Sequence, residues 1–326
     1  MAFPHLRGTS FVAENGGCSS ATLAEVSAEI DELTDAPLIS VLLPTVNPWP
    51  AVSSAMASLL SQTAAPPFEV LVLDGHGAAL SATCPEPAVR WLRLPGKDSF
   101  ALRAAGIAAA RGAIVVVSED HCTAPSDWLA SIAAAHHADA RSALVGVTVN
   151  HPDSRSSAMD RANFVLTFAG QNPSRLDIRW DRLPVPTNLS FKRAALPPAS
   201  LGAGEFEYAW LAQLREARAL GVCPSVVLQH KQSWGWRVLG VHLASGRAYG
   251  ATVRGWPWKE RWRWWLALPL LPLRLARLSI PDLLGEAAGS TPHFGDLFCL
   301  VTLILANLTG QILGATSGAG TSRQRL

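Results

Sequence analysis

Residues 114–129 read IVVVSEDHCTAPSDWL, and this stretch decides the fold. Its run of mostly β-branched residues ends at Ser118, where three titratable side chains follow, as they do at the carboxyl end of a buried strand in a parallel sheet. Two earlier stretches repeat the pattern, because residues 39–47 read ISVLLPTVN and residues 68–75 read FEVLVLDG. The sequence therefore predicts an α/β protein with polar residues gathered at one edge of a mostly parallel sheet.

Helical patterns alternate with these strands. Val52, Met56 and Leu59 fall on one face of a helix, and residues 98–111 form a second helix that Gly112 ends. The expected strands are residues 39–43, 69–73, 113–117 and 144–149. The resulting order, β-α-β-α-β-α-β, predicts a three-layer α/β/α domain.

Composition limits the classes of protein that fit. The 326 residues can hold one large domain with appendages or two small domains, and with 49% hydrophobic and 16% charged residues some apolar surface should meet lipid or a partner. A net charge of +2 without clustered basic and aromatic residues on a polar background argues against nucleic acid as a partner.

The five cysteines form no Cys-x-x-Cys pair, which indicates a reducing compartment and argues against a zinc site. The N-terminus does not read as a secretory signal, so we expect the main domain to stay in the cytoplasm.

The last part of the chain is apolar and rich in tryptophan. Residues 256–280 read WPWKERWRWWLALPLLPLRLARLSI, and seven of the twelve tryptophans fall between Trp234 and Trp265. This mixture indicates a segment lying at a bilayer interface, with a buried packing element as the alternative. Residues 297–313 are nearly uncharged and about long enough to span a bilayer. We expect three parts: an N-terminal extension with a short helix (1–37), a main α/β domain (38–240) and a C-terminal membrane-associated helical region (241–326).

Three predicted strands end in polar residues that are candidates for chemistry. Pro44-Thr45-Val46-Asn47 ends the first strand, Asp74-Gly75 ends the second, and Glu119-Asp120-His121 ends the third. In a doubly wound sheet, ligands bind outside these carboxyl ends. Carboxylates beside a histidine can hold a divalent cation, and a cation there could neutralise a diphosphate.

The order and spacing of SVLLPTVN, SLLSQT, FEVLVLDG, AAARG and IVVVSEDHCTAPSDWL resemble those of the family 2 glycosyltransferases, which have the GT-A fold, over about residues 38–236. The resemblance implies an enzyme that moves a sugar from a nucleotide-diphosphate donor to a glycan, lipid-linked or small-molecule acceptor. It also implies that the enzyme acts at the cytoplasmic face of the plasma membrane, in the synthesis of envelope glycans or glycolipids. Pro44, Thr45 and Asp74 would then cradle the nucleotide base. The full set of substrate-binding candidates is Pro44, Thr45, Asn47, Asp74, Gly75, Arg103, Asn188 and Trp234.

The metal motif of that family, Asp-x-Asp, falls on Glu119-Asp120-His121 in this chain. Either His121 replaces a carboxylate as a ligand, or Asp120 turns in to do so, or metal dependence is weakened. We favour a retained Mg²⁺ or Mn²⁺, because Asp120 keeps a hard oxygen within reach. His230 falls where several family members have a histidine that completes the metal shell.

The resemblance also implies a catalytic base. Residues 187–193, TNLSFKR, are similar to the family's acceptor-side segment, and an acidic pair then opens an expected helix at 205–220 that Gly221 stops. In inverting members an acidic residue at this place removes the proton of the acceptor hydroxyl. The register of the helix selects Glu207, with Glu205 as the alternative.

Two other functions remain open at this point. A Rossmann-type nucleotide-cofactor enzyme would need a glycine-rich turn after the first strand, and residues 44–50 contain no glycine. A non-catalytic membrane scaffold on a degenerate GT-A fold is compatible with the altered metal motif. Metal-dependent protection by a nucleoside diphosphate would separate such a scaffold from an active enzyme.

Overall fold

The fold is built on one mixed sheet of eight strands. The computed structural model describes residues 36–76, 88–154, 157–168, 171, 185–196, 210–232, 234–284 and 293–322. The strands run in the order β3-β2-β1-β4-β7-β6-β8-β5. Their bounds are β1 Ile39–Thr45, β2 Phe68–Asp74, β3 Val89–Arg93, β4 Ile114–Val117, β5 Cys122–Thr123, β6 Ala143–Asn150, β7 Leu189–Lys192 and β8 Leu220–His230. Strands β1 to β4 are parallel, β7 pairs antiparallel with both β4 and β6, β6 is parallel to β8, and the short β5 is antiparallel to β8.

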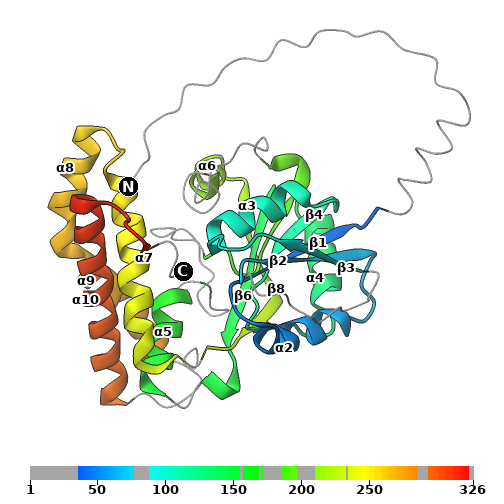
Figure 1. Cartoon of the computed structure of the whole chain (residues 1–326), viewed down its shortest axis with the longest axis horizontal. Helices are drawn as coiled ribbons and strands as arrows, with labels where there is room; N and C mark the ends of the chain where they lie inside the picture. Colours follow the sequence, from blue (N-terminus) through cyan, green and yellow to red (C-terminus); the bar gives the residue numbers. More distant parts are fainter. Residues whose placement is uncertain are drawn as a thin grey trace, which may run out of the picture.

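Helices cover both faces of this sheet (Figure 1). Alternate residues of β1 point to opposite sides, so that Val41 and Leu43 join one apolar cluster and Leu42 joins the other. The first cluster includes residues of α2 (Trp49–Leu60) and α4 (Trp128–Ala138), and the second includes residues of α3 (Ser99–Ala109) and α6 (Leu211–Glu216). The predicted three-layer α/β/α architecture is confirmed.

Most of the predicted elements are present, but one boundary is wrong. The four expected strands correspond to β1, β2, β4 and β6, and the expected helix at 98–111 is α3, whose N-cap is Asp98. The helix expected at 205–220 ends at Glu216, and Gly221 lies inside β8. Gly221 does not stop a helix, and a Cβ there would lie 2.6 Å from the guanidinium carbon of Arg141, so a larger residue would require that side chain to move.

A second group of helices stands beside the sheet (Figure 1). It contains α5 (Ala158–Phe168), α7 (Val238–Val253), α8 (Trp258–Ala267), α9 (Leu271–Leu284) and α10 (Phe294–Ser317). Residues of α5, α7, α9 and α10 share one buried apolar cluster. A buried ion pair between Arg161 and Asp296 joins α5 to the first turn of α10. The sheet and the helical region therefore have separate apolar cores, and α10 is fixed to the helices around it.

Helices α7 and α10 pack closely against each other through glycines. Each helix carries two glycines four residues apart, Gly246 and Gly250 on α7 and Gly310 and Gly314 on α10. A Cβ on any of the four would lie 2.1 Å from a backbone oxygen of the facing helix. The two helices run parallel, since Gly246 faces Asn307 and Gly250 faces the later Gln311. Small residues at this spacing let helix backbones touch, as they do inside membranes.

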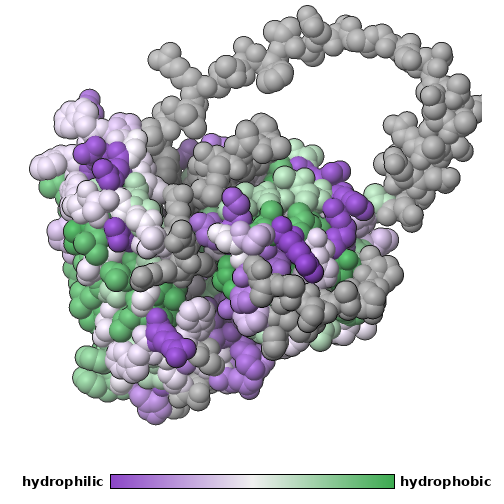
Figure 2. Space-filling view, in the orientation of Figure 1, coloured by the Kyte–Doolittle hydropathy of each residue, from purple (hydrophilic) through white to green (hydrophobic). Residues whose placement is uncertain are grey.

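The outer face of the helical region is apolar and basic. Figure 2 shows hydrophobic residues gathered on the side formed by α9 and α10. The exposed large hydrophobic residues of α8 to α10 are Trp258, Trp262, Leu266, Leu273, Leu284, Phe294, Leu297, Phe298, Val301, Leu305, Ile312 and Leu313. The exposed basic residues of the same helices are Lys259, Arg261, Arg263, Arg274 and Arg277. Within the described residues, one helix, Phe294–Ser317, is long and apolar enough to cross a membrane.

Candidate active site

The predicted site lies where the parallel strands end. Thr45 and Asp74 are partners in the register of β1 and β2, and both are buried. The backbone N–H of Gly75 donates to the carbonyl of Thr45 over 2.9 Å, and a Cβ on Gly75 would lie 2.6 Å from the carbonyl oxygen of Lys97. Asp74 accepts a hydrogen bond from the backbone of His76 at 2.9 Å. The first two predicted strand ends therefore lie side by side. There is no room for a side chain at residue 75.

Three predicted metal ligands converge at the neighbouring strand ends. His121 Nε2 lies 2.9 Å from His230 Nε2 and 3.1 Å from Glu119 Oε2, and His230 Nε2 lies 3.2 Å from the same oxygen. Glu119 and His121 follow β4, whereas His230 is the last residue of β8. The short pairing of β5 with β8 sets Cys122 opposite His230, which brings the two histidines together across 109 residues of sequence. This group of one carboxylate and two imidazoles can hold a metal ion.

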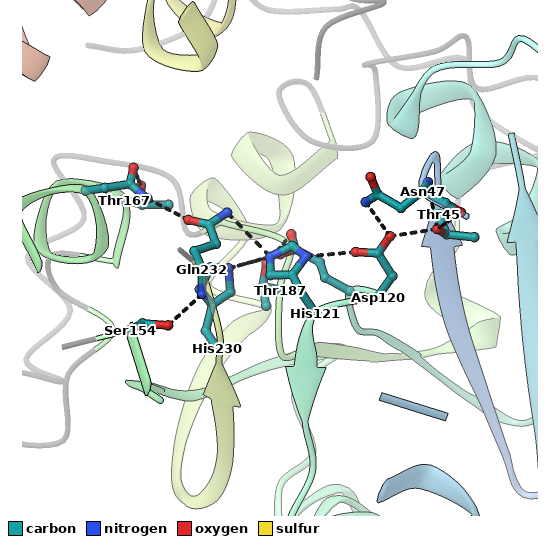
Figure 3. Close-up of polar contacts among 11 residues, drawn as sticks. Thr45, Asn47, Asp120, His121, Ser154, Thr167, Thr187, His230 and Gln232 are labelled. Carbon is teal, nitrogen blue, oxygen red and sulfur yellow. Dashed lines mark hydrogen bonds and ion pairs between the residues drawn. The ribbon is translucent and has the colours of Figure 1, made fainter. Parts of the chain in front are cut away.

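The atoms of these ligands that face away from the convergence point are held by other side chains (Figure 3). Thr187 Oγ1 donates to Glu119 Oε1 over 2.6 Å. Asp120 Oδ1 lies 2.8 Å from His121 Nδ1, while its other oxygen accepts from Thr45 Oγ1 at 2.6 Å and from Asn47 Nδ2 at 2.8 Å. A carboxylate on the far nitrogen of a ligating histidine fixes the tautomer and the ring orientation. Asp120 is therefore placed beside the three converging ligands, where it orients His121.

The electrostatics of the cluster follow from burial and from charge. Burial raises the pKa of Glu119, but hydrogen bonds from His121 and His230 outweigh that effect and hold its pKa well below the usual range. Burial lowers the pKa of His121, but its hydrogen bonds to Asp120 and Glu119 prevail and raise it to about 10. Burial and the charge of His121 lower the pKa of His230 to about 4. Without a metal, the cluster holds one imidazolium between two carboxylates, and a cation can take its place.

Gln232 was not identified from the sequence, although it lies within the same site. Its Nε2 is 3.4 Å from His121 Nε2, its backbone N–H donates to Ser154 Oγ, and its Oε1 accepts from Asn163 Nδ2 at 2.5 Å. Asn163 in turn lies 2.8 Å from His242 Nε2 on α7. A series of hydrogen-bonded side chains thus joins the candidate metal site to the helical region. The available sequence signal was weak, namely a polar residue two positions after a strand-ending histidine.

The remaining predicted residues differ in their placement. Asn188 is buried, has a φ of 58°, accepts from Trp128 Nε1 and donates to the carbonyls of Val147 and Val226, so its contacts give it a structural role. Arg103 is buried on α3, and its guanidinium lies 5.3 Å from the ring centroid of Phe100. Pro44 is buried within β1. Substrate binding by these three residues stays a prediction.

Trp234 and the two candidate bases complete the set. Trp234 is 40% exposed, and its backbone N–H donates to Asp160 Oδ1. It lies two residues beyond Gln232 in the sequence, and its binding role stays a prediction. Glu205 and Glu207 lie outside the described residues. The predicted N-terminal helix within residues 1–37 falls almost wholly outside them too.

Comparisons with known proteins agree with this fold. Residues 40–196 match the family model for Glycosyl transferase family 2. Among solved structures, the mannosyltransferase PcManGT from Pyrobaculum calidifontis, in complex with GDP-Man and Mn²⁺, has a TM-score of 0.50 at 16% identity, covering 86% of this chain and 87% of that one. TarS 1-349 from S. aureus has a TM-score of 0.40 at 14% identity, covering 82% of this chain and 90% of that one. No curated protein matches the chain in sequence.

The fold and the matched segment define the class of this protein as the GT-A glycosyltransferases. Over residues 40–196 the chain is similar to glycosyl transferase family 2, and the protein is a glycosyltransferase.

Proposed function

We propose that this enzyme transfers a sugar from a nucleotide-diphosphate donor to an acceptor hydroxyl, with the donor bound at the carboxyl ends of β1, β2 and β4 and with a divalent cation nearby. The observation that carries the proposal is the convergence of Glu119 Oε2 with the Nε2 atoms of His121 and His230. These donors fit a divalent cation in number and chemistry. The solved structure of PcManGT, which shares the fold, carries GDP-Man and Mn²⁺ in its complex.

In the proposed mechanism, each residue of the site has a defined task. When bound, a divalent cation would supply Lewis-acid stabilisation of the leaving nucleotide diphosphate. Glu119, His121 and His230 would hold it, and Asp120 keeps the ring of His121 in one orientation. Thr45 and Asp74 lie at the ends of β1 and β2, where the resemblance places the nucleotide base.

We assign the removal of the acceptor proton to Glu207, with Glu205 as the alternative. The acceptor oxygen would then attack the anomeric carbon in a single displacement, with inversion of configuration, as the nucleotide diphosphate leaves. The base follows from the family resemblance of residues 205–215. It is tested in the Discussion by separate changes of the two glutamates.

Donor screening tests the proposed reaction. Purified protein is incubated with a panel of UDP-, GDP-, dTDP- and CDP-linked sugars, and release of the nucleoside diphosphate is measured with and without candidate acceptors. We expect release from one donor class, which is lost in the Glu119→Ala, His230→Ala double variant. Asp127→Asn, an exposed carboxylate on the same segment, is the matched control and should release nucleotide as the wild type does. If the wild type binds none of the donors and releases no nucleoside diphosphate, the proposed transfer is excluded.

We further propose that the enzyme works at the cytoplasmic face of the plasma membrane, on an acceptor for an envelope glycan or glycolipid. The support is the outer face of α8 to α10, which combines exposed tryptophan and leucine with arginine and lysine. Tryptophan favours the headgroup region, and basic residues attract anionic lipid. Helix α10, with 24 residues, is long enough to reach across the hydrocarbon core.

A further inference from the structure

Helix α10 is exposed along one straight apolar stripe. Phe294, Val301, Leu305 and Ile312 are all exposed, and at about 100° per residue they lie within about 40° of one another around the helix axis. At about 1.5 Å per residue they extend over about 27 Å of the helix. Together with the exposed residues that flank them, they form what we call the α10 stripe: Phe294, Leu297, Phe298, Val301, Leu305, Ile312 and Leu313. Soluble monomers rarely leave a continuous apolar patch of this kind open to water.

The polar groups beside the stripe are satisfied within the protein. Thr302, Thr309 and Thr316 each donate their hydroxyl to the backbone carbonyl four residues earlier, over 2.8, 2.8 and 2.9 Å. The one charged residue of α10, Asp296, is buried in its ion pair with Arg161. Unsatisfied polar groups and charges are what make transfer from water to lipid costly. The exposed face of α10 therefore loses little when it enters lipid.

The opposite side of α10 is fixed to the helices around it at both ends. At its start, Asp296 pairs with Arg161 of α5. At its end, Nε of Arg247 on α7 donates to the carbonyl of Gly318 over 2.9 Å. Between these points, the glycines of α7 and α10 bring the two helix backbones into contact. Helix α10 thus runs alongside its neighbours over its whole length and does not project from them (Figure 1).

This packing is incompatible with a helix that crosses a bilayer. Helix α5 carries Phe168, whose ring packs edge-on against His230 of the candidate metal site, with 4.6 Å between centroids. Helix α7 begins at Val238 and carries buried His242 and half-buried Arg247. A crossing α10 would draw α5 and α7 into the hydrocarbon with it, where charged side chains are costly. The length and composition of α10 permit a span, but its contacts oppose one.

The neighbouring helices α8 and α9 carry positive charge on the same outer face, which Figure 2 shows to be rich in apolar residues. Their acidic residues, Glu260 and Asp282, are half-buried and buried. A second copy of the chain seated on this face would bring the cations of both copies together, and like charges oppose such a contact. Anionic lipid matches an apolar stripe bordered by cations. These cations are Lys259, Arg261, Arg263, Arg274 and Arg277.

We propose that α10 lies along the membrane within one leaflet and does not cross it. The α10 stripe then enters the boundary of headgroups and acyl chains, to a depth of about 5–10 Å, while the cations of α8 and α9 contact anionic headgroups. This inference rests on the membrane part of the proposed function and adds how the protein is held there. Gly318, which follows α10, stays on the same side of the membrane as the sheet domain.

A protease-protection experiment tests the position of α10. The full-length protein carries one epitope tag before Met1 and another after Leu326, and inside-out membrane vesicles from a bacterial host are treated with protease. We expect both tags to be digested without detergent, because neither lies behind the membrane. In the control, an unrelated transmembrane segment between Leu326 and the second tag should protect that tag. Protection of the second tag without the added segment would show that α10 crosses the membrane, and would overturn the inference.

Point variants test the stripe itself. Leu305→Ser with Ile312→Ser removes two exposed apolar side chains, and we expect binding of the purified protein to phosphatidylglycerol vesicles to fall about tenfold or more. The control Leu38→Ser changes an exposed leucine of the sheet domain and should bind as the wild type does. Melting temperatures check that the variants are folded. Wild-type binding by the folded double variant, or an equal loss in the control, contradicts the proposed contact.

The remaining outcomes separate this inference from the proposed function. Wild-type protein that does not bind vesicles contradicts both the membrane location and the position of α10, whereas bound protein with a protected second tag contradicts only the position. A dimer in solution that the Leu305→Ser, Ile312→Ser variant dissociates would assign the stripe to a second copy and overturn the inference. Nucleotide release from sugar donors is measured on the same protein. Its absence counts against the proposed transfer and leaves the position of α10 as measured.

Discussion

Nδ1 of His121 lies 2.8 Å from Oδ1 of Asp120, and this contact determines which nitrogen of the ring faces His230. The other oxygen of Asp120 is held by Thr45 and Asn47, two residues at the end of β1. The strand end that the resemblance assigns to the nucleotide is therefore coupled, through one carboxylate, to the candidate metal site. A ligand that moves Thr45 would also affect His121.

Asp120→Asn tests this coupling. Removing the negative charge weakens the hold on His121 Nδ1, so we expect metal affinity to fall about 10- to 100-fold, as it does when such supporting carboxylates are changed elsewhere. Mn²⁺ titration of the purified variant measures the loss. Asp127→Asn serves as the control, because that carboxylate is exposed and lies outside the cluster. An unchanged Kd in folded Asp120→Asn would show that the contact does not support the metal.

The parallel packing of α7 and α10 predicts opposite effects for two glycine substitutions on one helix. Gly250→Ala places a Cβ 2.1 Å from the carbonyl oxygen of Gln311, so the helices must separate, and we expect a loss of about 1–3 kcal/mol. At Gly240 a Cβ meets nothing within 4 Å, and Gly240→Ala should stabilise the helix by about 0.5–1 kcal/mol. Melting temperatures of the two variants against wild type measure both effects. Equal shifts would mean that the glycines of α7 are not needed for its contact with α10.

Membrane binding is better tested by point substitutions than by truncation. Leu300 and Leu303 on α10 are fully buried, so removing everything after Trp256 would uncover apolar surface on α5 and α7. That new surface would itself change the solubility and the lipid binding of the protein. Arg261→Gln with Arg263→Gln removes two exposed charges, each worth about 1 kcal/mol near an anionic bilayer. We expect binding to phosphatidylglycerol vesicles to fall about tenfold or more in a flotation assay. Arg193→Gln, exposed in the sheet domain, is the control.

Two outcomes of the flotation assay would count against the membrane proposal. One is full-length protein that is monodisperse without detergent or lipid and does not float with vesicles. The other is equal loss of binding in the control variant. Trp258→Ser with Trp262→Ser tests the apolar part of the same face, since both side chains are at least 60% exposed.

The buried side chain of His136 should make the folded protein less stable as the pH falls. Its side chain is buried against Ser190, and burial, together with the charge of Lys192, lowers its pKa from the usual 6.5 to about 4. The unfolded chain therefore binds a proton in a range where the folded chain does not, so stability is lost as the pH falls from 6.5 toward 4. The full contribution is about 3 kcal/mol. The melting temperature of His136→Gln should depend less on pH in this window than that of wild type, and exposed His137→Gln should behave as wild type.

The sequence predicted the sheet core and the strand ends because those signals are local. Apolar runs such as residues 39–43 and 114–117 form buried strands in any α/β protein, and the polar residues after them must lie at the sheet edge. The strand β3, Val89–Arg93, was not predicted because two of its five residues are arginine and none of the five is fully buried. Gly221 was misread because a glycine after a helical pattern indicates a helix end, whereas here it lies inside β8 beside the side chain of Arg141.

The candidate site was only partly predictable for a related reason. The sequence placed Glu119 and His121 at one strand end, and the resemblance added His230, but their common meeting point depends on the pairing of β5 with β8. The role of Asp120 also required the structure, since nothing in Glu-Asp-His indicates which side chain turns toward β1. Long-range pairings of this kind leave no periodicity in the sequence.

The final prediction concerns the catalytic base. An acceptor hydroxyl is too weakly acidic to attack unaided at neutral pH, and a carboxylate within hydrogen-bond reach contributes about 10²–10⁴-fold in rate. In a helix, positions 205 and 207 point about 200° apart, so only one of the two glutamates can face the acceptor. Counting back from Leu214 and Arg215 selects Glu207. Glu207→Gln should lose most of kcat with donor affinity nearly unchanged, while Glu205→Gln should keep most of its activity. Steady-state rates and nucleotide Kd values of both variants decide the assignment: the reverse pattern moves the base to Glu205, and near-normal rates in the double variant exclude both.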